Sequence, residues 1–304
     1  MDRPTNRRLF LTHTVAGALG ALGGLAASRP AAAMEPVKRV GRAPLRLSCA
    51  AYSFRQWLTG ANKSMDLEQF IDKAAEMGVD AVELTSYYFP TEITPEYLNR
   101  IKRRCFLQGL DVSSTSVGNA FTLPAGPARD KEIAHVKQWV DYAADFGAPV
   151  IRVFAGTAAK DQTEEDARKN AIECMEIALE HAAKRGVFLG LENHGGIVTT
   201  AEQLLSIVKA IQSDWFGVNL DTGNFRSADP YKEMEQVAPY AVTVQVKTEL
   251  TPAGQRKQLG DLPREIGILR KAGYRGYVVL EYEAAEDAMV AVPRILGEMR
   301  KLLG

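Results

Sequence analysis

Short apolar runs alternate with longer segments of helical periodicity along the chain from about residue 45. We predict eight strands, at residues 45–51, 81–85, 111–115, 150–154, 187–193, 216–221, 241–247 and 277–282. Between them, apolar residues recur at helical spacing, as in the stripe formed by Ala167, Ala171 and Met175. Strands that alternate with helices indicate a parallel sheet.

Three positions predict where helices begin. Ser64 precedes an amphipathic run and is expected to be its N-cap. Thr163, with Asp166 three residues later, predicts a second N-cap. Pro293 is tolerated only near a first helical turn, so the last helix is expected to begin around Met289.

The number of strand–helix units indicates the architecture. Eight units in roughly 260 residues favour a single closed (β/α)8 TIM barrel over an open sheet. A doubly wound sheet is the alternative, but no G-x-G-x-x-G sequence follows the first predicted strand. We therefore expect a linker at residues 34–44 and a barrel at residues 45–304.

The N-terminus resembles a twin-arginine signal peptide. Arg7 and Arg8 precede a Gly/Ala-rich apolar run over residues 15–27, and three alanines at residues 31–33 offer a cleavage site. The run is too short and too rich in glycine for a membrane-spanning helix. We predict that residues 1–33 are removed and that the mature protein is periplasmic or extracellular, without stable membrane insertion.

Charge and cysteine usage narrow the classes of partner. The 37 basic and 37 acidic residues give a net charge of zero, so no basic excess is present to bind nucleic acid. Cys49, Cys105 and Cys174 are widely spaced without a CxxC pair, which predicts free buried thiols. Whether the chain forms a homo-oligomer stays open.

Polar residues interrupt the predicted strands near their carboxyl ends, where barrel active sites form. Glu192, Asp221 and Glu281 come from three strands, and Gln245 from a fourth offers an amide oxygen. Such an oxygen set suits Mn²⁺ or Mg²⁺ better than Zn²⁺. The alternative is a salt-bridge network of these acids with bases such as Arg152 and Lys247.

One histidine is a candidate acid or base. His194 shares a strand face with Glu192, because residues two apart on a strand point the same way. A single histidine at a strand end can also be a purely structural hydrogen-bonding group. We predict a catalytic role for His194 beside Glu192 and Glu281.

The ordered motifs resemble a known family. The sequences at residues 192–196 (ENHGG), 221–224 (DTGN), 245–247 (QVK) and 280–282 (LEY) resemble the sugar phosphate isomerase/epimerase group of xylose-isomerase-like barrels. The resemblance implies one divalent metal, often Mn²⁺ (with Mg²⁺ or Co²⁺ as alternatives), held by Glu192, Asp221 and Glu281. Gln245 stands where the family has a metal-binding His, and Asn224 where it has a substrate-binding His.

The resemblance also suggests which residues meet the substrate. Lys247 and Glu83 match positions that contact or frame it, and we add Arg152, which points to the same barrel mouth. The family includes endonucleases with three zinc ions, which need more histidines than His135, His181 and His194 can supply.

The leading hypothesis is therefore a metal-dependent isomerase or epimerase that moves a proton next to the carbonyl of a keto-sugar. A 3-keto-glycoside lyase, which begins with the same proton abstraction and then expels a leaving group, is the first alternative. A non-catalytic sugar-binding protein on the same barrel is the second.

Overall fold

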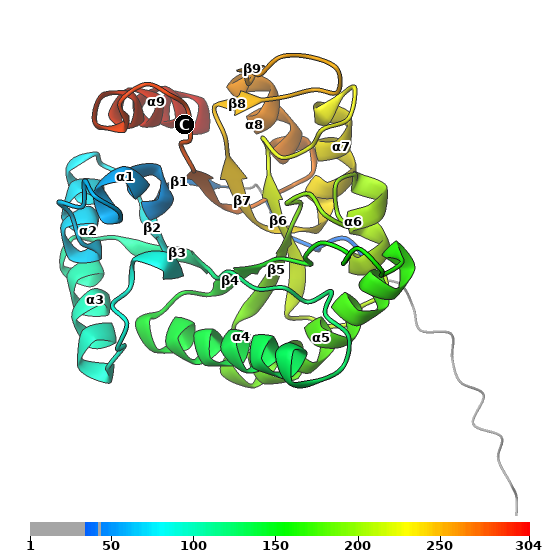
Figure 1. Ribbon diagram of the computed structural model, residues 1–304. Coiled ribbons are helices and arrows are strands. Elements are labelled where there is room, and N and C mark those ends of the chain that lie inside the picture. Colours follow the sequence, from blue (N-terminus) through cyan, green and yellow to red (C-terminus); the bar gives the residue numbers. More distant parts are fainter. Residues whose placement is uncertain (1–33, 42–43) are drawn as a thin grey trace, which may run out of the picture. The chain divides into compact units, whose positions relative to one another are not determined.

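The computed structural model describes residues 34–41 and 44–304, and the predicted signal peptide lies outside them. Within this part, eight parallel strands close into a barrel in the order β1-β10-β7-β6-β5-β4-β3-β2. Helices surround the strands (Figure 1). The predicted single (β/α)8 barrel is confirmed.

The barrel strands coincide with or overlap the predicted runs. Their bounds are β1 Leu45–Ala50, β2 Ala81–Thr85, β3 Asp111–Ser116, β4 Val150–Val153, β5 Phe188–Glu192, β6 Phe216–Asp221, β7 Ala241–Val246 and β10 Gly276–Leu280. Apolar side chains on both faces of the parallel strands are buried, as expected for a sheet enclosed by helices. Two further short strands, β8 (Glu249–Leu250) and β9 (Gln258–Leu259), form an antiparallel hairpin after β7 that the pattern did not predict.

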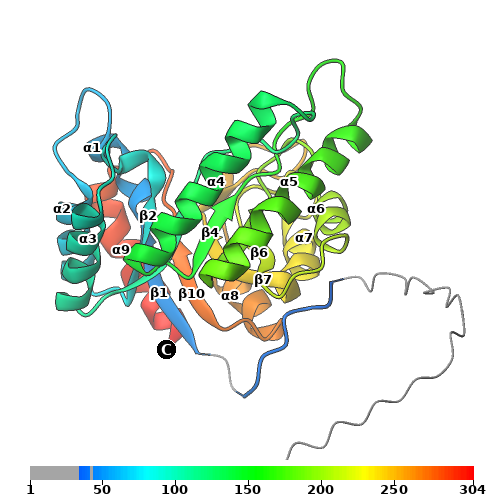
Figure 2. The ribbon, with the colours of Figure 1, turned by 90° about the horizontal axis from the view of Figure 1, so that it is seen from below.

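The helices pack outside the strands, as the turned view shows (Figure 2). Their bounds are α1 Arg55–Leu58, α2 Leu67–Glu76, α3 Pro95–Leu107, α4 Pro127–Phe146, α5 Glu164–Arg185, α6 Ala201–Val208, α7 Pro230–Val237, α8 Leu262–Lys271 and α9 Ala288–Leu303. Short 3-10 helices are η1 (Ala51–Phe54), η2 (Ser86–Tyr88) and η3 (Ala238–Tyr240). No helix in this described part is long and apolar enough to span a membrane.

The helix starts confirm two of the three predictions. The Thr163 side chain accepts from the Asp166 backbone N–H at the start of α5. α9 begins at Ala288 and contains Pro293. Ser64 as the cap of α2 is wrong, because Asp66 and Gln69 form a reciprocal capping box two residues further on.

The segment before the first strand lies against the barrel. The Val37 backbone N–H donates to Pro239 O at 3.0 Å, and the Arg39 guanidinium donates to Ala241 O at 2.6 Å. Part of the predicted linker is therefore attached where β7 begins. Elsewhere in the barrel, the three cysteines are free and buried, as predicted.

Candidate active site at the barrel mouth

The predicted metal ligands gather at the carboxyl ends of four neighbouring strands. Glu192 ends β5, Asp221 ends β6, Gln245 lies near the end of β7, and Glu281 directly follows β10. The barrel order places these strands side by side, and the register pairs Asp221 with Gln245. All four side chains are buried. The fold thus brings them to one mouth; whether they bind a metal stays a prediction.

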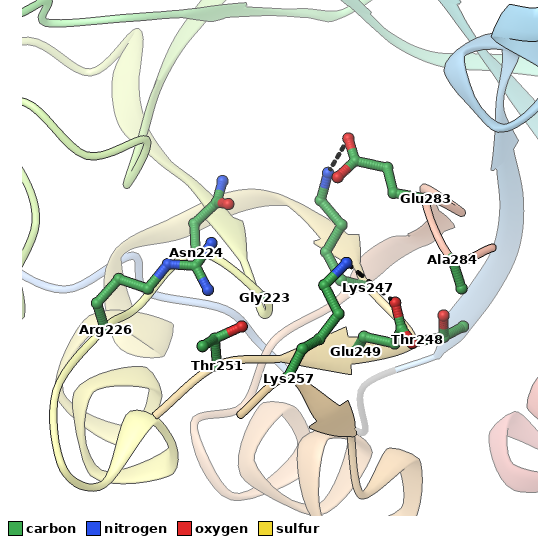
Figure 3. A pocket seen from close by; sticks show the side chains of 10 residues that line it. All are labelled: Gly223, Asn224, Arg226, Lys247, Thr248, Glu249, Thr251, Lys257, Glu283 and Ala284. Carbon is green, nitrogen blue, oxygen red and sulfur yellow. Dashed lines mark ion pairs between the residues drawn. The ribbon is translucent and has the colours of Figure 1, made fainter. Parts of the chain in front are cut away.

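The ammonium group of Lys247 lies among the carboxylates. Its Nζ is 2.6 Å from Glu281 Oε2, 3.5 Å from Asp221 Oδ2 and 2.8 Å from Glu283 Oε1; Figure 3 shows the pair with Glu283. Burial alone would lower the pKa of Lys247, but the surrounding carboxylates outweigh it and raise that pKa well above its ordinary value. The chain therefore supplies a permanent cation at the centre of the site.

Glu192 is held from both sides. Arg152 Nε lies 3.0 Å from Glu192 Oε2, and Asn224 Nδ2 donates to Glu192 Oε1 at 2.9 Å. Burial raises the pKa of Glu192 to about 7, even though Arg152 opposes the increase. A carboxyl with such a pKa can both accept and release a proton near neutrality. Two of the predicted substrate-binding residues, Arg152 and Asn224, therefore contact the predicted acid/base in the absence of substrate.

Gln245 presents its amide nitrogen to the acids. Its Nε2 donates to Glu83 Oε1 at 2.8 Å and to Glu281 Oε1 at 3.3 Å, while its Oε1 accepts from Asn219 Nδ2 at 2.6 Å. The opposite orientation would place the amide oxygen of Gln245 against two carboxylates. The two acids therefore favour the orientation in which the Gln245 nitrogen faces them. Metal ligation through the oxygen of Gln245 stays a prediction and would require this amide to turn.

Glu83 is enclosed below the mouth. It has 0% exposure, and its two carboxylate oxygens accept from the Ser114 and Ser116 hydroxyls at 2.7 and 3.0 Å. Burial raises the pKa of Glu83, and the Glu281 carboxylate adds to the increase. These contacts make Glu83 a residue that frames the site from beneath.

His194 lies at the rim. It is exposed, and its ring centroid is 4.3 Å from that of Phe154. The Phe154 ring also lies 3.9 Å from the Arg152 guanidinium carbon. Burial of part of the ring lowers the pKa of His194, and Arg152 lowers it further, so the imidazole is neutral at pH values near 7. A neutral imidazole beside the mouth can accept a proton, and its catalytic role stays a prediction.

Several residues that support the site lack a clear sequence signal. Asn193 donates to Asp221 O at 2.8 Å and accepts from the Asp221 N–H at 2.9 Å, which joins the ends of β5 and β6. Strand alternation places Asn219 on the face of Asp221 but does not identify Gln245 as its partner. Ser114 under Glu83 is predicted only as part of a strand, and Ser116 lies one residue beyond the run predicted at 111–115.

The donor chemistry suits a hard divalent cation. Asp221 Oδ2 is buried and accepts no hydrogen bond, and burial raises the pKa of Asp221 well above its ordinary value. Within the residues that the structure describes, no group of three or more His, Cys, Asp or Glu side chains is arranged to hold a metal. The ammonium of Lys247 instead contacts two of the predicted ligands, Asp221 and Glu281. The oxygen donors match such a cation in kind, and a bound ion would require them to draw together and this ammonium to move aside.

The fold and the site define a (β/α)8 barrel with an acid-rich mouth at the carboxyl ends of its strands. Residues 71–301 match the xylose isomerase-like TIM barrel family, and the chain belongs to this family. The predicted resemblance to xylose-isomerase-like barrels is therefore confirmed. A sequence search of curated proteins finds no match.

Solved structures with the same fold include two sugar epimerases. A D-psicose 3-epimerase crystallised in the presence of D-fructose has a TM-score of 0.68 and 15% identity, over 85% of this chain and 96% of that one. The 3-keto-D-glucoside 4-epimerase of E. coli has a TM-score of 0.67 and 16% identity, over 86% of this chain and 100% of that one. The IolI protein, solved with a zinc atom, has a TM-score of 0.67 and 16% identity, over 84% of this chain and 96% of that one. At these identities the likeness establishes the fold.

Proposed function

We propose that the protein is a sugar isomerase or epimerase that transfers a proton at the carbon next to the carbonyl of a keto-sugar. The observation that carries the proposal is the meeting of Glu192 and Glu281 with two buried cations, Arg152 and Lys247, at the barrel mouth. The names of two structural neighbours, which are epimerases of keto-sugars or of a keto-glucoside, support the same chemistry.

Proton transfer is assigned to two carboxylates. Glu192 and Glu281 come from β5 and β10, which are separated in the barrel by β6 and β7. One carboxylate can therefore remove a proton from one face of a carbon while the other returns it to the opposite face. His194 at the rim supplies a further neutral base. Lys247 and Arg152 place positive charge where the substrate oxygen becomes negative.

A divalent cation completes the proposed site. Glu192, Asp221 and Glu281 would hold it, and Mn²⁺ is the ion we propose, with Mg²⁺ or Co²⁺ as alternatives. When bound, it would polarise the carbonyl of the substrate and so acidify the neighbouring C–H. Asn224 would remain beside Glu192 to bind a substrate hydroxyl, and Lys247 would contact the substrate from its position beside Glu283.

The test is proton exchange in deuterated water. Purified protein supplied with Mn²⁺ is incubated with a panel of ketoses and 3-keto-glycosides, and NMR follows deuterium entering the carbon next to the carbonyl. We expect exchange with at least one substrate. Glu192→Gln and Glu281→Gln should each slow it roughly 100-fold or more, the range for loss of a positioned acid or base.

The matched control is Glu286→Gln. Glu286 lies five residues after Glu281 but pairs with Arg294 on the surface, at 2.6 Å. Exchange in this variant should equal that of the wild type. Undiminished exchange in the Glu192 and Glu281 variants, or none in the wild type with any substrate, would refute the proposal.

The products separate the alternatives. An epimerase changes only the configuration of the sugar, whereas a lyase releases a second sugar or an aglycone. A neighbour named as an epimerase of a 3-keto-glucoside supports that class of substrate, which either reaction would use. A binding protein would hold the sugar without deuterium exchange.

We also propose that the protein is exported through the twin-arginine pathway to the periplasm or the exterior. The support is the sequence pattern alone, with Arg7 and Arg8 before the apolar run. Replacing both arginines with lysine should leave the protein unprocessed in the cytoplasm. Unchanged export of that variant in a fractionation experiment would contradict the proposal.

A further inference from the structure

The position of Lys247 has a consequence for metal binding. Its ammonium is 2.6 Å from Glu281 Oε2 and 3.5 Å from Asp221 Oδ2, so it contacts two of the three carboxylates proposed as ligands. A divalent cation held by the same oxygens would lie close to the ammonium, and the two positive charges would repel strongly in a buried site. The ammonium of Lys247 therefore opposes binding of a metal to these oxygens.

We propose that Lys247 is an internal competitor of the metal, so that metal binding requires its ammonium to leave Asp221 and Glu281. This inference rests on the metal site within the proposed function. It assigns Lys247 control over how tightly the mouth holds a cation.

The structure also shows where the displaced ammonium can go. Glu283 Oε1 is already 2.8 Å from Lys247 Nζ, and its side chain is 40% exposed, in contrast to the buried Glu281. Beside these residues lies a cavity of about 50 Å³ that Lys247 and Glu283 help to line (Figure 3). A small outward movement would keep one ion pair, with Glu283, and release the two inner carboxylates.

The main experiment is a calorimetric titration with Mn²⁺. Removing the competitor in Lys247→Met should tighten Mn²⁺ binding roughly tenfold or more relative to the wild type. The matched control is Lys257→Met, because Lys257 lines the same cavity but pairs with Glu249 at 3.2 Å. Its affinity should equal that of the wild type.

A double-mutant cycle tests the role of Glu283. If Glu283 receives the displaced ammonium, Glu283→Gln should weaken Mn²⁺ binding in the wild type and leave it unchanged when Lys247 is already Met. Equal weakening in both backgrounds would mean that Glu283 acts on the metal directly and would overturn this step.

A measurement on the wild-type chain covers the case in which Lys247→Met does not fold. Acetic anhydride labels exposed amines, and mass spectrometry reads each lysine separately. Mn²⁺ should increase labelling of Lys247 several-fold while labelling of Lys257 stays constant.

The outcomes are distinct from those of the proposed function, since neither readout uses a sugar. Equal Mn²⁺ affinity of the wild type and Lys247→Met overturns the inference. Lack of Mn²⁺ binding by both proteins overturns it too, as does Mn²⁺ binding to the wild type without a change in Lys247 labelling. A protein that shows the expected competition but exchanges no proton with any keto-sugar would instead contradict the proposed reaction.

Discussion

Glu265 on α8 is a buried acid without a compensating charge, and its replacement tests the electrostatics of the fold. It has 1% exposure, and the side chain that most lowers its pKa is the uncharged Thr222, through a hydrogen bond. Burial raises the pKa of Glu265 from 4.5 to about 8. The folded protein therefore holds this side chain protonated at neutral pH, whereas the unfolded chain releases the proton.

The sign of the effect follows from this proton. Between pH 4.5 and about 8 the folded state binds one more proton at Glu265 than the unfolded state, so stability falls as the pH rises. Integrating between the two pKa values gives a cost of about 1 kcal/mol at about pH 5 and about 4 kcal/mol at about pH 8. Glu265→Gln keeps the shape of the side chain and removes the titration.

The assay is urea unfolding of the wild type and Glu265→Gln at these two pH values. The stability of the variant relative to the wild type should rise by about 3 kcal/mol from the lower to the higher pH. Any new contact made by the amide of the variant contributes equally to stability at both pH values, so it cancels when the two relative stabilities are subtracted. If the relative stability is the same at both pH values, Glu265 is not held protonated by burial.

Three further changes have expected outcomes. Glu281→Gln should lower the Mn²⁺ content of purified protein, measured by elemental analysis, because it removes one anionic ligand. His194→Ala should lower turnover while leaving bound Mn²⁺ largely intact; loss of the metal would instead make His194 a ligand. Gly196→Ala should destabilise the protein by about 2 kcal/mol in thermal or urea unfolding, because its φ is 56° and an added Cβ would collide with Gly156 O. Wild-type stability of that variant would contradict the close backbone approach.

The barrel could be predicted because its strands differ in composition from everything around them. The runs at 81–85 and 216–221 coincide with β2 and β6, in which apolar residues occupy every second position. The run at 187–193 extends beyond β5, which ends at Glu192. Beyond the end of β5, the Asn193 side chain bonds the backbone of Asp221. Such long-range contacts have no local periodicity.

Two other differences have separate causes. The cap of α2 is Asp66 and not Ser64, and the sequence contains this signal, since Asp66 and Gln69 have the spacing of a capping box. The sequence pattern does not predict the β8–β9 hairpin, because each of its strands has only 2 residues, too few for an alternating pattern.

At the site, strand alternation predicts which side chains meet but not how they pair. It brings Gln245, Lys247 and Glu281 to one mouth. The amide orientation of Gln245 depends on Asn219 and Glu83, which come from other strands. The position of Lys247 depends on the torsions of a long side chain that reaches Glu283 after β10. Both are products of tertiary packing.

The charge balance of the mouth connects these findings. Its carboxylates are those of Glu83, Glu192, Asp221, Glu281 and Glu283, and its bases are Arg152 and Lys247. The acidic groups outnumber the basic ones. Burial removes water from the carboxylates and so raises the pKa values of Glu83, Glu192 and Asp221. A cation from solution, or protons taken up by these carboxyls, would relieve the imbalance, whereas a neutral sugar alone would not. If the protein holds a metal, the sugar should therefore bind after it, to a mouth whose charge the metal has already reduced.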